Sequence, residues 1–168
     1  AGARHARRHP SEREGGEMLI IGDGGHASVI KTFFDGDIVA IGDNATRKRV
    51  VEEKMREGWW TNDVAIHPTA VINGPVSIGV GTVIMAGVIV QIGAWIGKHV
   101  ILNTGCVVDH DCIIEDYAHI APGAHLCGNV HIGEGTLVGV GVGIGPNTKI
   151  PSWSIVKAAR LDICPCTQ

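Results

Sequence analysis

Residues 66–101 read IHPTAV-INGPVS-IGVGTV-IMAGVI-VQIGAW-IGKHVI, six hexads that each begin with an aliphatic residue. The pattern runs on to residue 161 without a slip, and a small residue follows four positions after each aliphatic one, except at Arg160. The sixteen aliphatic positions are Ile66, Ile72, Ile78, Ile84, Val90, Ile96, Leu102, Val108, Ile114, Ile120, Leu126, Ile132, Val138, Ile144, Ile150 and Val156.

A period of six fits neither the 3.6 residues per turn of an α-helix nor the alternation of a strand. A fixed internal period indicates a solenoid, in which each hexad is one short strand and a corner. Three hexads would form one triangular coil, so sixteen hexads predict a β solenoid of about five coils. Glycines at the second hexad position are expected to supply positive φ at the corners; they are Gly79, Gly97, Gly133, Gly139 and Gly145. The alternative, a β-sandwich, would alternate with period two.

The composition excludes several classes of protein. Aromatic residues make up 4% of the 168 residues, which suits a narrow aliphatic prism, and the formal net charge of -3 gives no reason to expect nucleic acid or a membrane as partner. Cys106 and Cys112 occupy small inward positions, which favours reduced thiols and a cytoplasmic location. Cys164 and Cys166 could bind a metal, but no second cysteine pair completes a tetrahedral site, so no metal is expected.

The sequence divides into four parts. Residues 1–17 lack periodicity and carry little apolar surface, which predicts a disordered leader. Residues 18–62 predict a small α/β unit, residues 63–161 the β-helix, and residues 162–168 a short tail. A unit of this size is only marginally stable alone, so we expect it to pack against the solenoid.

The α/β unit begins with a predicted strand over residues 18–21. The glycine-rich segment 22–27 follows it and leads into a helix that reaches toward Phe34. These glycines would allow a tight turn and a phosphate on the free amides of the helix start. The alternative is a glycine turn that only joins strand to helix, because a lone G-x-G-x-x-A match is weak.

A second strand is predicted over residues 38–41, and a second helix follows it. Residues 43–46 offer several N-caps, and the helix should run to about Glu57 with Gly58 as its stop. Val50, Val51 and Met55 are expected on one face of this helix.

The repeat resembles the left-handed parallel β-helix of the hexapeptide-repeat acyltransferases. Further motifs resemble one subgroup, the bacterial UDP-4-amino-sugar N-acetyltransferases and sialic-acid O-acetyltransferases. They are Gly24-Gly25-His26-Ala27, Ala40-Ile41-Gly42-Asp43-Asn44, Ile66-His67-Pro68, Asn103-Thr104, Asp109-His110-Asp111-Cys112 and His119-Ile120-Ala121-Pro122-Gly123. The resemblance implies a homotrimer that transfers an acetyl group from acetyl-CoA to an amino or hydroxyl group of a sugar or nucleotide-sugar.

The chain departs from this subgroup in two places. Only about ten residues separate Ile30 from Ala40, where members carry further strands of the nucleotide-binding domain. After Val156 the closing hexads give way to Lys157 and a short tail. The carboxylate-bearing strand that would hold the nucleotide is therefore short or missing, and part of the coenzyme groove is in doubt.

His110 is the candidate general base. It stands at the third hexad position, facing outward between Asp109 and Asp111. Acyl transfer needs a group that takes the proton of the acceptor, and a carboxylate bonded to one imidazole nitrogen orients the ring and raises its basicity. The resemblance assigns proton acceptance to His110 and its support to Asp111. The alternative is a solvated surface histidine among acids.

The resemblance also implies binding residues. His119 would contact acetyl-CoA, and Gly139, Val140 and Gly141 would line the groove for its pantetheine arm. The positions that would touch the nucleotide-sugar are Gly24, Gly25, His26 and Gly42. For His119 the alternative is a structural hydrogen bond at a corner.

Two other functions remain open from the sequence. His99, His125 and His131 also face outward and could form a metal cluster, although no histidine pair has the five-residue spacing of zinc-binding β-helix carbonic anhydrases. The shortened first unit and tail would also suit a non-catalytic β-helix that serves as a scaffold or binding module.

Overall fold

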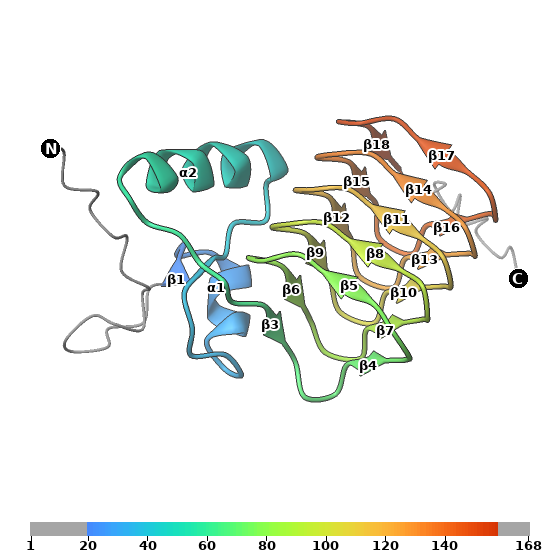
Figure 1. The fold of residues 1–168 in the computed structure, drawn as a ribbon, viewed down its shortest axis with the longest axis horizontal. Coiled ribbons are helices and arrows are strands. Elements are labelled where there is room, and N and C mark those ends of the chain that lie inside the picture. Colours follow the sequence, from blue (N-terminus) through green and yellow to red (C-terminus); the bar gives the residue numbers. More distant parts are fainter. Residues whose placement is uncertain (1–19, 158–168) are drawn as a thin grey trace, which may run out of the picture.

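A computed structural model describes residues 20–157, so the predicted leader and tail, including Cys164 and Cys166, lie outside the described residues. The described part has an α/β unit beside the first coils of a β-helix (Figure 1). The unit contains β1 (Ile20–Ile21), α1 (Gly25–Ile30), β2 (Ile38–Val39) and α2 (Asn44–Arg56). No helix within residues 20–157 is long and apolar enough to cross a membrane.

The β-helix consists of strands of two residues each. They are β3 (Ala65–Ile66), β4 (Val71–Ile72), β5 (Ser77–Ile78), β6 (Val83–Ile84), β7 (Ile89–Val90), β8 (Trp95–Ile96), β9 (Ile101–Leu102), β10 (Val107–Val108), β11 (Ile113–Ile114), β12 (His119–Ile120), β13 (His125–Leu126), β14 (His131–Ile132), β15 (Leu137–Val138), β16 (Gly143–Ile144), β17 (Lys149–Ile150) and β18 (Ile155–Val156). Each pairs in parallel with the strand three further along, so one coil takes three hexads, as the pairing of Val107 with His125 illustrates. The predicted parallel β-helix is confirmed.

The strands form three faces of a prism. Face 1 is β3-β6-β9-β12-β15-β18, face 2 is β4-β7-β10-β13-β16, and face 3 is β5-β8-β11-β14-β17. We call the turns between faces 1 and 2 the first corner (residues 139–142 and their equivalents in the other coils). The second corner joins faces 2 and 3 (109–112 and equivalents), and the third corner joins faces 3 and 1 (115–118 and equivalents). In a triangular coil the second corner lies opposite face 1.

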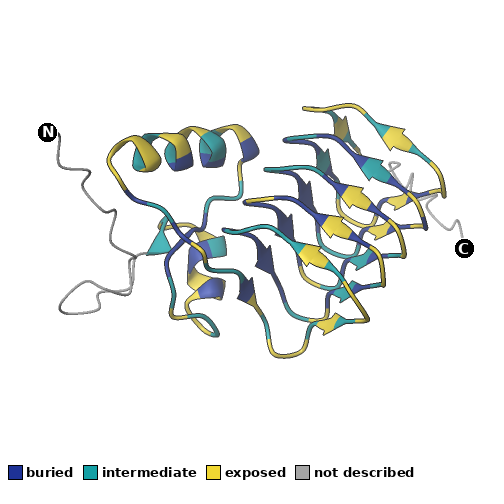
Figure 2. Cartoon of the chain, viewed as in Figure 1, coloured by how far each residue is buried: buried dark blue, intermediate teal, exposed yellow. Residues whose placement is uncertain are grey.

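The aliphatic position of the hexad fills the prism, as predicted. Ile84, Leu102 and Ile120 are fully buried. Cys106 and Cys112 at the small position are buried free thiols, also as predicted. Buried residues concentrate in the middle coils, while the last coil is more open (Figure 2). Ile66 is 40% exposed because the first coil has no further coil on its N-terminal side to cover it.

The positive φ angles of the hexads do not lie at the second position. They lie at the fourth, apart from Gly74 at the third, and several are carried by residues other than glycine, such as His99 and Tyr117. The prediction for Gly79, Gly97, Gly133, Gly139 and Gly145 is therefore wrong. Three of these glycines have another role, since a Cβ would meet the next coil; at Gly79 it would lie 2.5 Å from the Gly97 carbonyl carbon.

Gly133→Ala tests this role. The added Cβ would lie 2.4 Å from the Ser152 backbone nitrogen, so we expect the free energy of unfolding to fall by about 1–3 kcal/mol. Gly145→Ala is a matched control at the same hexad position, because a Cβ there meets nothing within 4 Å among residues 20–157. Urea unfolding followed by circular dichroism measures both. Equal midpoints for the two variants would contradict the close-approach explanation.

The α/β unit differs in detail from its prediction. β1 and β2 pair in parallel. Helix α2 starts after the N-cap Asp43, whose side chain accepts from Thr46 N at 2.8 Å, and Gly58 follows its end. β2 is shorter than the predicted 38–41. The buried face of α2 is formed by Asn44, Arg47 and Val51, whereas Met55 is 53% exposed, because α2 docks with its N-terminal half on the β-helix.

Arg47 joins the unit to the β-helix. Its side chain is buried, Nε donates to His99 O at 2.9 Å, and Nη2 donates to Tyr117 O at 2.6 Å. Nη1 donates to Ile41 O at 2.8 Å, and Nη2 also donates to Asn44 Oδ1 at 2.9 Å. One guanidinium therefore satisfies carbonyl groups of two coils and of the loop before α2. Burial lowers the pKa of Arg47 to about 10, so it stays charged at neutral pH.

Candidate functional site: a histidine-aspartate pair and a buried histidine cluster

His110 and Asp111 lie at the second corner, between β10 and β11. The His110 side chain is 57% exposed, and its Nδ1 is 2.9 Å from Asp111 Oδ2. The hydrogen bond with Asp111, followed by the charge of Asp109, raises the pKa of His110. A carboxylate on Nδ1 fixes the proton there and leaves Nε2 as the acceptor. The predicted outward position and the predicted neighbours of this histidine are confirmed.

Two glycines make room for this pair, which the sequence analysis missed. A Cβ on Gly128, one coil further, would lie 2.6 Å from Nε2 and Cε1 of His110. A Cβ on Gly93, one coil earlier, would lie 2.4 Å from Asp111 Oδ1. The sequence could have indicated these glycines through the coil length, because each glycine lies one full coil from the side chain that it accommodates. Nε2 of His110 therefore faces the bare backbone of Gly128.

A second group of polar residues lies on face 1, against the α/β unit. His119 is 8% exposed; its Nδ1 lies 3.3 Å from Gly42 O and its Nε2 lies 3.1 Å from Asn103 Nδ2. The same amide nitrogen is 3.4 Å from His26 Nε2, and the two imidazole rings meet edge to face. His26, Gly42 and His119, predicted from three separate motifs, thus form one cluster with Asn103.

The imidazoles of this cluster are neutral. Burial, then the charge of Arg47, then His26 lower the pKa of His119 to about 4. Burial and Arg47 also lower the pKa of His26. A neutral His119 donates from Nδ1 to the Gly42 carbonyl and accepts at Nε2 from Asn103, so both ring nitrogens are engaged.

The other predicted residues lie elsewhere. Gly139, Val140 and Gly141 form the first corner, where Val140 is 63% exposed and Gly141 has φ +65°. Gly24 and Gly25 are exposed at the start of α1, where an added Cβ would meet nothing within 4 Å. The backbone there is open to a ligand.

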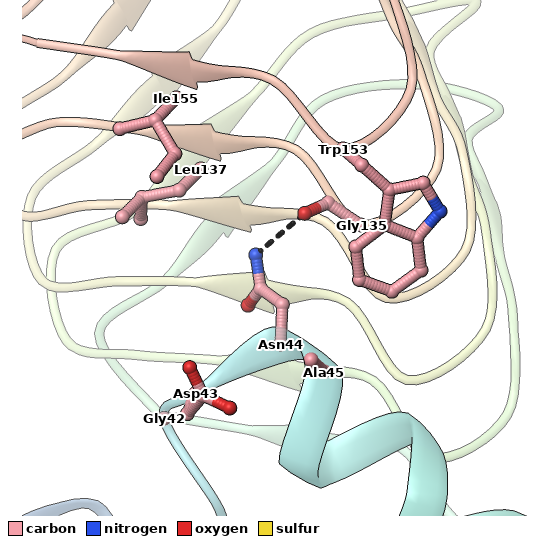
Figure 3. A pocket seen from close by; sticks show the side chains of 8 residues that line it. All are labelled: Gly42, Asp43, Asn44, Ala45, Gly135, Leu137, Trp153 and Ile155. Carbon is pink, nitrogen blue, oxygen red and sulfur yellow. Dashed lines mark hydrogen bonds between the residues drawn. The ribbon is translucent and has the colours of Figure 1, made fainter.

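A cavity of about 200 Å³ lies between the start of α2 and the C-terminal coils of the β-helix. Leu137 and Ile155 form its apolar wall, Trp153 closes one side, and Asn44 donates to Gly135 O at 3.0 Å across its floor (Figure 3). Gly42, a predicted substrate residue, also lines it.

The predicted site residues do not converge within one chain. The His110–Asp111 pair is at the second corner, Val140 is at the first corner, and the His119 cluster is on face 1, opposite the second corner. His99, His125 and His131 are likewise spread over the third corner, face 2 and face 3. His99 is buried rather than facing outward, so that part of the prediction is wrong. Among residues 20–157, no three His, Cys, Asp or Glu side chains are placed to hold a metal ion.

Comparisons with known proteins agree with the parallel β-helix fold. The family Bacterial transferase hexapeptide (six repeats) matches residues 93–128 and 111–146. A histidine mutant of perosamine N-acetyltransferase from Caulobacter crescentus, solved with CoA and GDP-perosamine, is 33% identical with a TM-score of 0.79, over 86% of this chain and 87% of that chain. The chain belongs to the hexapeptide-repeat transferases.

This hexapeptide-repeat transferase is also similar to the acetyltransferase domain of PglB from Neisseria gonorrhoeae. That domain is 29% identical, with a TM-score of 0.78 over 84% of this chain and 88% of that chain. The same domain has been solved in complex with acetyl coenzyme A. No curated protein sequence matches the transferase. The family expected from the hexads is confirmed.

Proposed function

We propose that this transferase moves an acetyl group from acetyl-CoA to the amino group of a nucleotide-linked amino sugar. The observation that carries the proposal is the His110–Asp111 pair, held at an outward corner of a hexapeptide β-helix. The similarity to perosamine N-acetyltransferase, solved with CoA and GDP-perosamine, supports the coenzyme, the acceptor class and nitrogen rather than oxygen as the acylated atom.

In the proposed reaction, His110 acts as the general base. Its Nε2 accepts a proton from the acceptor amine as the amine nitrogen attacks the thioester carbon. The carbon–sulfur bond then breaks, and the CoA thiolate leaves with the proton that the imidazolium returns. Asp111 fixes the ring and stabilises the transient imidazolium, which matches the raised pKa of His110.

The coenzyme is proposed to lie along Gly139, Val140 and Gly141, where a pantetheine arm could pack on the exposed Val140 side chain. The amides of Gly139 and Gly141 donate to Val156 O and Pro122 O within the β-helix. Exposure of Val140 supports this position. Both ring nitrogens of His119 are engaged, so its proposed contact with the coenzyme is one of packing. The acceptor nucleotide is proposed to bind at Gly24, Gly25, His26 and Gly42, near the cavity of Figure 3.

These proposed subsites require a second subunit. His110 lies opposite the face that carries the α/β unit, so the base of one chain must serve an acceptor held by its neighbour. A closed ring of three β-helices would repeat this contact at each interface. Light scattering at assay concentration should therefore give a trimer, and a monomeric active enzyme would contradict the shared site.

Buried free thiols support a reducing, cytoplasmic location as part of the proposal. Cys106 and Cys112 are buried and free, and burial raises the pKa of Cys106 to about 12, which keeps it an unreactive thiol.

Gly128→Ala tests the position of the base. The added Cβ would lie 2.6 Å from His110 Nε2 and must displace the ring, so kcat should fall about 10- to 100-fold with little loss of stability. Gly143→Ala is the control, because a Cβ there meets nothing within 4 Å in the part of the chain that the structure describes. Steady-state kinetics at saturating substrates measure the effect. An unchanged kcat in Gly128→Ala would contradict the proposal that His110 Nε2 accepts the proton of the acceptor amine.

Acetyl-CoA binding tests the function as a whole. Calorimetry should show saturable binding with a dissociation constant in the range of about 1 µM to 1 mM, as for the substrates of most enzymes. CoA without the acetyl group should compete. If calorimetry detects no binding up to millimolar coenzyme, the chain is a non-catalytic scaffold or binding module.

A further inference from the structure

A second cavity lies at the third corner, away from every residue assigned above. It encloses about 220 Å³ between the loop after α2 and the N-terminal coils of the β-helix. Its walls include Met55, Trp59, Trp60, Lys98, His99 and Tyr117, none of which lines the cavity of Figure 3. Two tryptophans and the tyrosine thus meet here, in a chain with only 4% aromatic residues.

Two buried polar atoms of this cavity's walls lack partners. Trp59 and His99 are each 6% exposed, and within residues 20–157 neither Trp59 Nε1 nor His99 Nδ1 has a hydrogen-bond partner. Leaving such a group unpaired costs about 1–3 kcal/mol. His99 Nδ1 faces the backbone of Gly81, which does not line the cavity, so Trp59 Nε1 is the atom for which a ligand could recover part of this cost.

The walls combine aromatic rings with one fixed donor. The His99 ring stacks on Tyr117 at 5.3 Å with an interplanar angle of 10°, so these two rings hold each other in place on one rigid side of a cavity that Trp59 and Trp60 also line. Trp59 Nε1–H can only donate, which requires an acceptor on the ligand. His99 is neutral, because burial lowers its pKa to about 4, and a neutral imidazole has one donor and one acceptor nitrogen.

Size and polarity narrow the class further. A volume of about 220 Å³ lies below the roughly 300–1,000 Å³ typical of drug-sized ligands, so it suits one ring system rather than a whole nucleotide. Lys98 and Asp116 also line the cavity and could meet polar groups at the edge of a ring.

We propose that this cavity binds a nucleobase-like heteroaromatic ring, with Trp59 Nε1 donating to a ring nitrogen or carbonyl and Trp60 stacking on its face. Stacking of a base on an aromatic side chain contributes about 1–3 kcal/mol. The inference does not rest on acetyl transfer, because no residue of the proposed catalytic machinery lines this cavity. An enzyme without activity could still bind here.

The test is titration of the full chain with adenosine and with uridine, followed by tryptophan fluorescence and calorimetry. At least one nucleoside should quench the fluorescence saturably. Trp59→Phe keeps an aromatic ring and removes the donor, so it should raise the dissociation constant about five- to tenfold, the loss expected for one neutral hydrogen bond. Trp95→Phe is the matched control, since Trp95 is 45% exposed and lines neither of the two cavities, and should leave the constant unchanged.

Met55→Trp provides a second variant. Met55 is 53% exposed where it lines the cavity, so the larger side chain should narrow the opening with little effect on folding. Calorimetry should show binding reduced at least tenfold. The proposal is overturned if neither nucleoside binds below about 10 mM, or if methyl glucoside binds as well as they do. It is also overturned if Trp59→Phe and Met55→Trp leave binding unchanged, which would place the nucleoside at the proposed nucleotide-sugar site instead.

Discussion

His110→Ala is expected to lower kcat by about 10²- to 10⁴-fold, the usual contribution of a general base, while the unfolding transition stays where it is. The unfolding transition should not change because of where His110 lies. The side chain is 57% exposed at a corner and fills no part of the prism. Stopped assays of CoA release measure the rate, and thermal unfolding measures the stability. A His110→Ala enzyme with wild-type kcat would falsify the assignment.

The pH dependence gives an independent signature of the same base. A base works only when neutral, so kcat/KM should fall as the pH drops through the raised pKa of His110. Asp111→Asn removes the main cause of that raised pKa, so the acidic limb should move to lower pH while the plateau falls less than in His110→Ala. An unshifted limb would separate Asp111 from the base.

The double variant shows whether the two residues act together. If Asp111 works through His110, its substitution should cost little once His110 is alanine. Full additivity of the two losses would remove Asp111 from the mechanism.

Arg47→Ala should have the largest effect on stability. It removes the donors that satisfy His99 O, Tyr117 O and Ile41 O and leaves these carbonyls in a dry junction. Breaking a buried charged network of this kind costs about 3–5 kcal/mol in the free energy of unfolding. The measurement is the urea midpoint at one fixed protein concentration, because an oligomer's stability depends on concentration.

Arg49→Ala is the matched control in the same helix. Arg49 is 63% exposed and pairs with Glu53 at 3.1 Å, an exposed i,i+4 pair worth only a few tenths of a kcal/mol. Equal midpoints for the two alanine variants would show that Arg47 does not hold the junction.

Much of the fold could be predicted from the hexads because every coil repeats the same inward pair of side chains. The wrong prediction concerned the glycines at the second hexad position. Such a glycine can be needed either for a positive φ angle or for the close approach of the next coil, and the sequence does not distinguish the two. Gly133 serves close approach, and the positive φ falls at positions such as Tyr117, where a larger side chain accepts it.

The contacts of the candidate site were also only partly predictable from the sequence. The contact between His110 and Asp111 joins adjacent residues, so the sequence could suggest it. The bonds of His119 to Gly42 and of His26 to Asn103 each span 77 residues and depend on how the α/β unit docks on face 1. Arg47 gave no sequence signal, because a buried arginine and an exposed one look the same in a polar helix.

The central claim is that His110 transfers the proton during acetyl transfer from acetyl-CoA to a nucleotide-linked amino sugar. The most direct measurement follows free CoA when the wild-type enzyme and His110→Ala receive acetyl-CoA and GDP-perosamine or a UDP-4-amino-sugar. The account predicts acceptor-dependent release by the wild type and a rate at least about 100-fold lower in a folded His110→Ala enzyme of the same oligomeric state. Release that is independent of the acceptor, or equal in the two enzymes, would contradict it.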